Sequence, residues 1–144
     1  EYTYTPTQYG METKYAYLNA DGQEMDSNYH IEKYDDLGRL EEEQYKNSQG
    51  TVTSRTIYVY QDAEEEWLRK YYYEGSDLSD YDAYSEREVV GDTTTITEYS
   101  WIEKQGEYVA TYRHEYVEDE QGNIIIDSEY YDQDTVPFRQ TRTV

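Results

Sequence analysis

Aromatic side chains are the residues of this sequence whose types and spacing best suit binding chemistry. Trp67, Tyr71 and Tyr73 recur within one run, and Tyr99 and Trp101 within another. Residues two apart on a strand share a face, so each run is predicted to present a strip of aromatic side chains. In the first run, Trp67 is predicted to lie on the same face as Tyr71 and Tyr73. Such a strip stacks on sugar rings or on a protein partner if it is exposed. The alternative, which the shortage of aliphatic residues favours, is that these rings form the core.

Acidic side chains suggest a second kind of chemistry, which is calcium binding. Asp77, Asp80 and Asp82 cluster around one predicted turn, and residues 118–120 (Glu-Asp-Glu) around another. Hard oxygen ligands in loops suit Ca²⁺. Neither segment has the spacing of a calcium-binding loop, so the alternative is a solvated acidic turn. A structural Ca²⁺ ion is the only cofactor that the sequence suggests.

Catalytic motifs are missing from the sequence. The 33 Asp and Glu residues guarantee accidental carboxylate pairs, so no pair can be selected as that of a glycosidase. His30 and His114 are too far apart for a His-Glu-x-x-His site, and we expect each on a strand face among tyrosines. There is no Gly-x-Ser-x-Gly motif, no phosphate-binding glycine loop and no cysteine. We therefore predict that the protein is not an enzyme.

Tyrosine supplies most of the bulk that this chain can pack. The sequence has 21 tyrosines and one phenylalanine, Phe138, while Leu, Ile, Val and Phe together make up only 21 of 144 residues. Few aliphatic residues and a net charge of −21 are typical of disordered chains. Disordered chains are also poor in aromatics, whereas this one is 17% aromatic. We therefore expect a folded protein whose order depends on tyrosine packing.

The net charge limits the classes of partner. A chain at −21 is repelled by nucleic acid and by anionic membrane surfaces, so neither is expected as a partner. No apolar run reaches 18 residues, so no membrane insertion is expected. A protein or a glycan remains as the expected partner, and cationic ligands and divalent ions stay open.

Glycines divide the chain at intervals of mostly 12 to 16 residues, the length of one strand and one turn. Four of them close polar turns that open with Asn or Asp, at residues 19–22, 35–38, 47–50 and 119–122. The runs between the turns are rich in β-branched and aromatic residues, and both faces mix tyrosines with charges. We predict one all-β domain over residues 1–144. It is an antiparallel meander of about eight to ten strands with glycine turns, either repeat-like or partly single-layered.

One turn carries a recognisable motif. Residues 34–40 read YDDLGRL, and looser copies lie at residues 116–124 and 17–23. The segment resembles the core of the YD repeat of Rhs-type and teneurin-type proteins. This resemblance implies antiparallel hairpins wound one after another in secreted or cell-surface bacterial proteins. Toxin-enclosing shells of that family need far more than 144 residues, so encapsulation is not expected. The short Tyr-Gly hairpin repeats of MORN-like proteins are the alternative resemblance.

These observations favour a non-catalytic bacterial module that binds a partner or spaces other domains. The resemblance implies an extracellular, periplasmic or cell-surface location. The first residue, Glu1, is compatible with a mature protein after signal removal or with a trimmed chain. The alternative function is a carbohydrate-binding module that uses the aromatic strips.

Overall fold

A single antiparallel sheet contains all the regular structure that the computed structural model describes, over residues 2–7, 10–75, 77, 79–131 and 134–143. Its eleven strands are β1 (Tyr2–Thr7), β2 (Gly10–Leu18), β3 (Glu24–Tyr34), β4 (Leu40–Lys46), β5 (Val52–Tyr60), β6 (Trp67–Glu74), β7 (Ala83–Val90), β8 (Thr93–Ile102), β9 (Glu107–Glu118), β10 (Ile124–Tyr131) and β11 (Arg139–Arg142). Each strand pairs with the next one along the chain, so spatial order equals sequence order. The predicted all-β meander is confirmed, with one strand more than the expected range.

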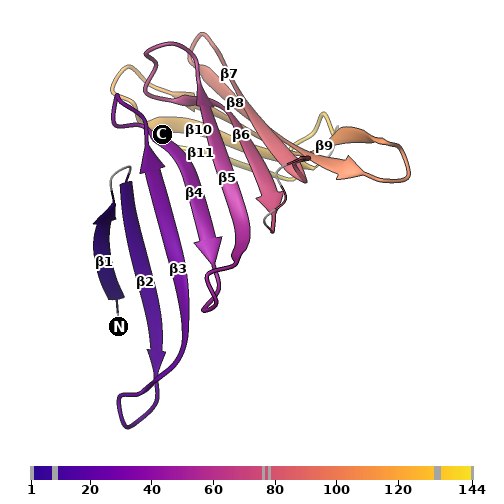
Figure 1. The fold of residues 1–144 in the computed structure, drawn as a ribbon. Helices are drawn as coiled ribbons and strands as arrows, with labels where there is room; N and C mark the ends of the chain where they lie inside the picture. The colour runs from indigo at the N-terminus through magenta and orange to yellow at the C-terminus, as the bar shows by residue number, and fades with distance from the viewer. Residues whose placement is uncertain (1, 8–9, 76, 78, 132–133, 144) are drawn as a thin grey trace.

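The sheet is a single open layer. In the part of the chain that the structure describes, extensive contacts between strands occur only between neighbours in the sheet, and β1 does not pair with β11. Figure 1 shows the layer twisting strongly along its length. The accessible surface of 10162 Å² is well above the ~7,800 Å² expected for a compact monomer of 17.3 kDa. This architecture explains why both faces of the predicted strands mix tyrosines with charges.

Packing within this layer comes from large side chains lying over small ones. Ile31 and Tyr130 are the only buried hydrophobic residues among those described. The other buried side chains are polar and mostly small, namely Thr13, Ser27, Gln44, Ser85, Thr94 and Ser128. Tyrosines on adjacent strands contact some of these small residues, since the Tyr72 hydroxyl lies 3.3 Å from the Ser85 hydroxyl. Cross-strand pairs thus replace the aliphatic core of an ordinary domain.

Four hairpins share the same turn chemistry. In each turn, a side-chain oxygen of the first residue accepts the backbone N–H groups two and four residues later, at 2.9–3.0 Å. These first residues are Asn19, Asp35, Asn47 and Asp119. The glycine three positions on has a φ of 78° to 80° in every case, a backbone region that other residues rarely adopt. The turns predicted from Asn or Asp followed by Gly are confirmed at all four positions.

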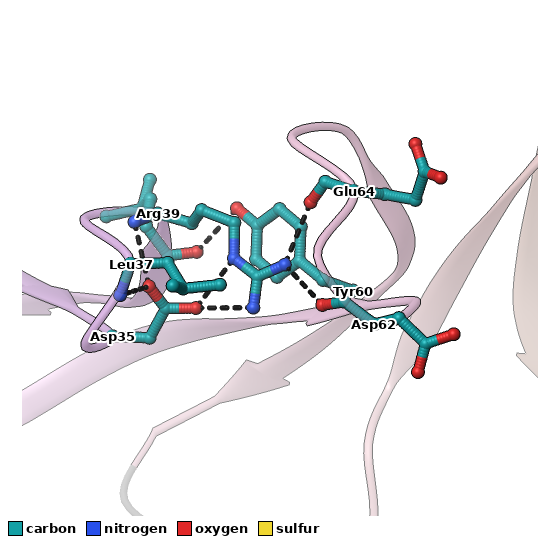
Figure 2. Close-up of polar contacts among 7 residues, drawn as sticks. Asp35, Leu37, Arg39, Tyr60, Asp62 and Glu64 are labelled. Atoms are coloured by element: carbon teal, nitrogen blue, oxygen red, sulfur yellow. Dashed lines mark hydrogen bonds and ion pairs between the residues drawn. The ribbon is translucent and has the colours of Figure 1, made fainter.

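The YDDLGRL segment adds a link between hairpins, which Figure 2 shows. Arg39 Nε and Nη2 each lie 2.7 Å from Asp35 Oδ2, and Nη1 donates to the carbonyls of Asp62 and Glu64 at 2.8 Å. Its guanidinium also lies 4.4 Å from the Tyr60 ring centroid. The backbone N–H and the guanidinium of Arg39 hold the pKa of Asp35 below its ordinary value. Arg39 therefore ties the β3–β4 turn to the loop between β5 and β6.

Candidate functional site: an aromatic cleft

Strand register brings aromatic side chains together across β6, β7, β8 and β9. Tyr71 pairs with Tyr84, and Tyr84 pairs with Tyr99 on the next strand. Trp101 pairs with Tyr108 one strand further on. Because directly paired residues project from the same face of a sheet, rings from four consecutive strands gather on one face.

These rings form one contiguous group, which we call the aromatic cluster. Its members are Tyr71, Tyr73, Tyr81, Tyr84, Tyr99, Trp101 and Tyr108. Tyr84 stacks on Tyr99 with ring centroids 4.5 Å apart, and Tyr81 stacks on Tyr108 at 4.8 Å. Trp101 meets Tyr108 edge-on at 5.1 Å. Offset-stacked and edge-to-face pairs are the favourable arrangements of aromatic rings, so the cluster is a well-packed surface.

A cleft of about 500 Å³ opens beside this cluster, and we call it the aromatic cleft. It is lined by Asp80, Tyr81, Asp82, Trp101 and Tyr108. Trp101 keeps 47% of its surface exposed, so the indole is available to a ligand. The volume lies within the range of about 300–1,000 Å³ typical of small-molecule sites.

Backbone contacts fix the loop that forms one wall of the cleft. This loop joins β6 to β7 and carries Tyr81, whose carbonyl accepts a hydrogen bond from the Tyr108 hydroxyl. The backbone N–H of Trp101 donates to the backbone carbonyl of Asp82 at 3.2 Å. Asp82 Oδ2 accepts the N–H of Glu74 at 2.5 Å. The two walls of the cleft are therefore held together by hydrogen bonds before any ligand binds.

Three hydroxyls of the cluster, those of Tyr84, Tyr99 and Tyr108, are donors at neutral pH. Burial, reinforced by neighbouring negative charges and tyrosines, raises the pKa of Tyr108, Tyr84 and Tyr99 above the ordinary value of 10.0. These phenols therefore stay protonated, and the negative charge at the cleft comes from Asp80 and Asp82.

Four of the five residues predicted to bind a ligand belong to the aromatic cluster, and Trp67 does not. On β5 the neighbouring residues Val59 and Tyr60 pair with Arg69 and Trp67 of β6, which are two residues apart. One extra residue is therefore inserted on β6. Such a bulge interrupts the alternation of faces. The Trp67 ring consequently lies 4.2 Å from the ammonium of Lys70. The prediction that Trp67 shares a face with Tyr71 and Tyr73 is therefore wrong.

The carboxylates proposed for calcium do not converge among the residues that the structure describes. Asp80 and Asp82 line the aromatic cleft, whereas Asp77 accepts the Ser79 N–H at 2.9 Å. In the second predicted cluster, at residues 118–120, Asp119 uses its carboxylate to close its own turn. Among the described residues, neither segment therefore brings three carboxylates together.

Sequence reasoning missed two sets of residues. Tyr81, Tyr84 and Tyr108 complete the aromatic cluster. The register of β7 and β9 against their neighbours reveals Tyr84 and Tyr108, whereas Tyr81 comes from the loop between β6 and β7. His30 was expected among tyrosines and does stack on Tyr45 at 4.6 Å. It also lies with Glu32 and Glu43 in a group whose ligand atoms are all within 4.8 Å of one another. The His-x-Glu spacing on one strand was the available signal, while Glu43 comes from the next strand.

Comparison with known proteins adds information on the fold alone. No protein-family profile matches the chain, and no curated protein is similar to it in sequence. A solved structure of a protein of unknown function from Bacteroides fragilis NCTC 9343 is similar, with a TM-score of 0.54 over 93% of each chain and 10% sequence identity. Within the described residues, no helix has the length and apolar character needed to cross a membrane.

Proposed function

We propose that this chain is a non-catalytic binding module that holds a carbohydrate in the aromatic cleft. The observation that carries the proposal is the exposed indole of Trp101 beside the rings of Tyr81 and Tyr108, with the carboxylates of Asp80 and Asp82 on the same cleft. The C–H faces of a sugar ring are apolar and pack on aromatic rings, while its hydroxyls donate to carboxylates. Both complementary groups line this one cleft.

The rigidity of the aromatic cluster also supports binding. Tyr81 stacks on Tyr108, and the Tyr108 hydroxyl donates to the Tyr81 carbonyl. These side chains are ordered before a ligand binds, so binding costs little conformational entropy. The described strands form one layer, so no second sheet covers the aromatic cluster, which suits an extended ligand such as an oligosaccharide. A role in spacing other domains is compatible with the same architecture and does not require the cleft.

We also propose that the module works outside a bacterial cell, at the surface or in the periplasm. The support for this part is the resemblance of the turn at residues 34–40 to the YD repeat of secreted and cell-surface proteins. Catalysis is not part of the proposal, since the cleft combines rings with carboxylates but the sequence has no motif of a hydrolase.

A glycan array followed by calorimetry on the best hit tests the function. We expect Trp101→Ala to weaken binding at least tenfold, because the exposed indole is the stacking platform. Trp67→Ala is the matched control, since that indole lies on the other side of the sheet beside Lys70. The proposal fails if no glycan binds, or if the two variants lose affinity equally.

Tetramethylammonium as a competitor distinguishes a cation site, since rings beside carboxylates also bind such ions. Turnover of the bound glycan would contradict a non-catalytic role.

A further inference from the structure

A second group of chemically competent side chains lies across β3 and β4. His30 and Glu32 are two residues apart on β3, and Glu43 on β4 pairs directly with Glu32. The three side chains therefore project from one face. Glu43 pairs with Thr56 on β5, and Thr56 pairs with Tyr72 on β6, so these residues share one face of the sheet. Tyr73, the next residue on β6, lies on the opposite face. The group is thus independent of the aromatic cleft.

The imidazole of His30 is the unusual member of this group. Its Nε2 atom is buried and has no hydrogen-bond partner in the part of the chain that the structure describes. Glu43 Oε1 approaches it to 3.3 Å, close enough for an ion pair but without hydrogen-bond geometry. A buried polar atom without a partner costs free energy and calls for an explanation, and an ion bound by Nε2 supplies one.

The spacing of these atoms suits a small tetrahedral ion. Zinc ligands lie about 2.0–2.2 Å from the metal, which places neighbouring ligand atoms about 3.3–3.5 Å apart. The 3.3 Å between His30 Nε2 and Glu43 Oε1 matches one edge of such a tetrahedron. The third ligand atom, from Glu32, lies within 4.8 Å of the other two, so rotation of a flexible carboxylate completes the set.

Neighbouring tyrosines orient all three side chains. The Tyr58 hydroxyl donates to Glu43 Oε2, and the Tyr34 hydroxyl donates to Glu32 Oε2 at 3.0 Å. The His30 ring is stacked on Tyr45 at an interplanar angle of 12°. Outer hydrogen bonds of this kind hold metal ligands in place and are a regular feature of metal sites.

The charges of the group also favour a cation. Glu32 and Glu43 face one another directly across two strands, an arrangement that destabilises a sheet when it is not compensated. Lys70 is the cation that acts on Glu43 from β6, and its ammonium lies over the Tyr58 ring at 5.1 Å. A bound dication compensates both carboxylates at once.

We propose that His30, Glu32 and Glu43 bind a divalent transition-metal ion, and the ligand chemistry favours zinc. One imidazole and two carboxylates suit Zn²⁺ and related ions, whereas Ca²⁺ takes six to eight oxygen ligands. Three protein ligands leave a fourth position for water. The ion joins β3 to β4, so its first effect is on the stability of this part of the sheet.

Calorimetric titration of the full chain with Zn²⁺, after dialysis against EDTA, tests the site. We expect one ion per chain and a rise in the melting temperature. His30→Gln and Glu43→Gln should each weaken binding at least tenfold and abolish the rise. His114→Gln is the matched control, because His114 Nε2 already lies 2.8 Å from Asp127 Oδ1 in a hydrogen bond. That variant should bind Zn²⁺ like the parent chain.

A second measurement keeps the test valid if a variant misfolds. In the parent chain, Zn²⁺ should change the ¹⁵N chemical shift of His30 Nε2. The ¹⁵N chemical shifts of the His114 ring should stay constant. The proposal is overturned if no saturable one-to-one binding occurs, or if the His30 nitrogens do not respond. It is equally overturned if Ca²⁺ binds as tightly and the variants bind Zn²⁺ like the parent, since that pattern means diffuse attraction to an acidic surface.

Discussion

Two turns of this protein have the same backbone hydrogen bonds, but their side chains make contacts over different distances. The Asp35 turn and the Asp119 turn each accept two N–H groups on one carboxylate oxygen, and each has a glycine at a φ near 80°. They differ at the residue after the glycine. Asn123 donates back to the carboxylate of its own turn at 3.0–3.1 Å, whereas Arg39 also reaches the neighbouring β5–β6 loop.

This difference separates two tasks of the motif. Asp and Gly close a hairpin, and the following residue decides whether the hairpin stands alone or is tied to the next hairpin on the same edge. The tie matters in a single-layer sheet, where the extensive contacts between described strands all join neighbours. The loop that Arg39 holds contains Asp62, a residue other than glycine with a φ of 48°. Arg39 thus stabilises a backbone conformation that is unfavourable by itself.

The largest expected effect is that of Arg39→Ala. It removes the charge-assisted bonds to two carbonyls and the contact with the Tyr60 ring, so we expect a loss of about 2–4 kcal/mol in the free energy of unfolding. Denaturant titration measures the loss, and hydrogen exchange should show faster exchange in residues 61–66. Arg39→Lys should recover less than half, because an ammonium cannot span the same acceptors. An unchanged exchange rate in that loop would contradict the proposed link.

Glycine substitutions should affect the two turns equally. Gly38→Ala and Gly122→Ala each force a Cβ into a left-handed conformation, at φ values of 80° and 79°, with a cost of about 1–2 kcal/mol. Beyond the flanking residues, no described atom lies within 4 Å of a Cβ added at either position, so the cost is conformational and not steric. Denaturation midpoints of the two variants should therefore agree. A clear difference would show that the turns are not equivalent in their backbone.

Asn123→Ala should cost less than Arg39→Ala and act only locally. Among the described residues, this side chain bonds within its own turn, so we expect a loss of about 0.5–1 kcal/mol. Hydrogen exchange should change in residues 119–123 and stay constant in the adjacent β7–β8 turn. Faster exchange in that neighbouring turn would mean that this hairpin is tied to its neighbour as well.

Acid should weaken both turns, and Asp119→Asn should be the smallest change of the series. The pKa of each aspartate is below the ordinary value of 3.8, through N–H donors of Arg39 for Asp35 and of Asn123 for Asp119. Their stabilising contribution is therefore present above pH 3.8 and is lost as the pH falls through the folded pKa. Asn closes the same turn at Asn19 and Asn47, so Asp119→Asn keeps the turn and should melt only slightly below the parent at pH 7, through loss of the charge. Asp35→Asn should melt lower, since it also loses the ion pair with Arg39.

Features that depend on adjacent residues were predictable from the sequence. The four turns follow from Asn or Asp three residues before Gly, and the mixed faces of the strands indicated a thin sheet. Features that depend on pairing were not. The bulge at β6 turns Trp67 away from Tyr71, and the register of β3 with β4 brings Glu43 beside His30. A single sequence specifies which runs are strands, but the residue opposite each position follows from the lengths and bulges of all the hairpins.

The identity of spatial order and sequence order has a consequence for how the chain is made. Each strand needs only the strand synthesised just before it as a template, so a hairpin can form as soon as its second half leaves the ribosome. The loops that must close are short, and the entropy lost in closing them is small. The sheet can therefore grow during translation, one strand at a time, without waiting for the C-terminus.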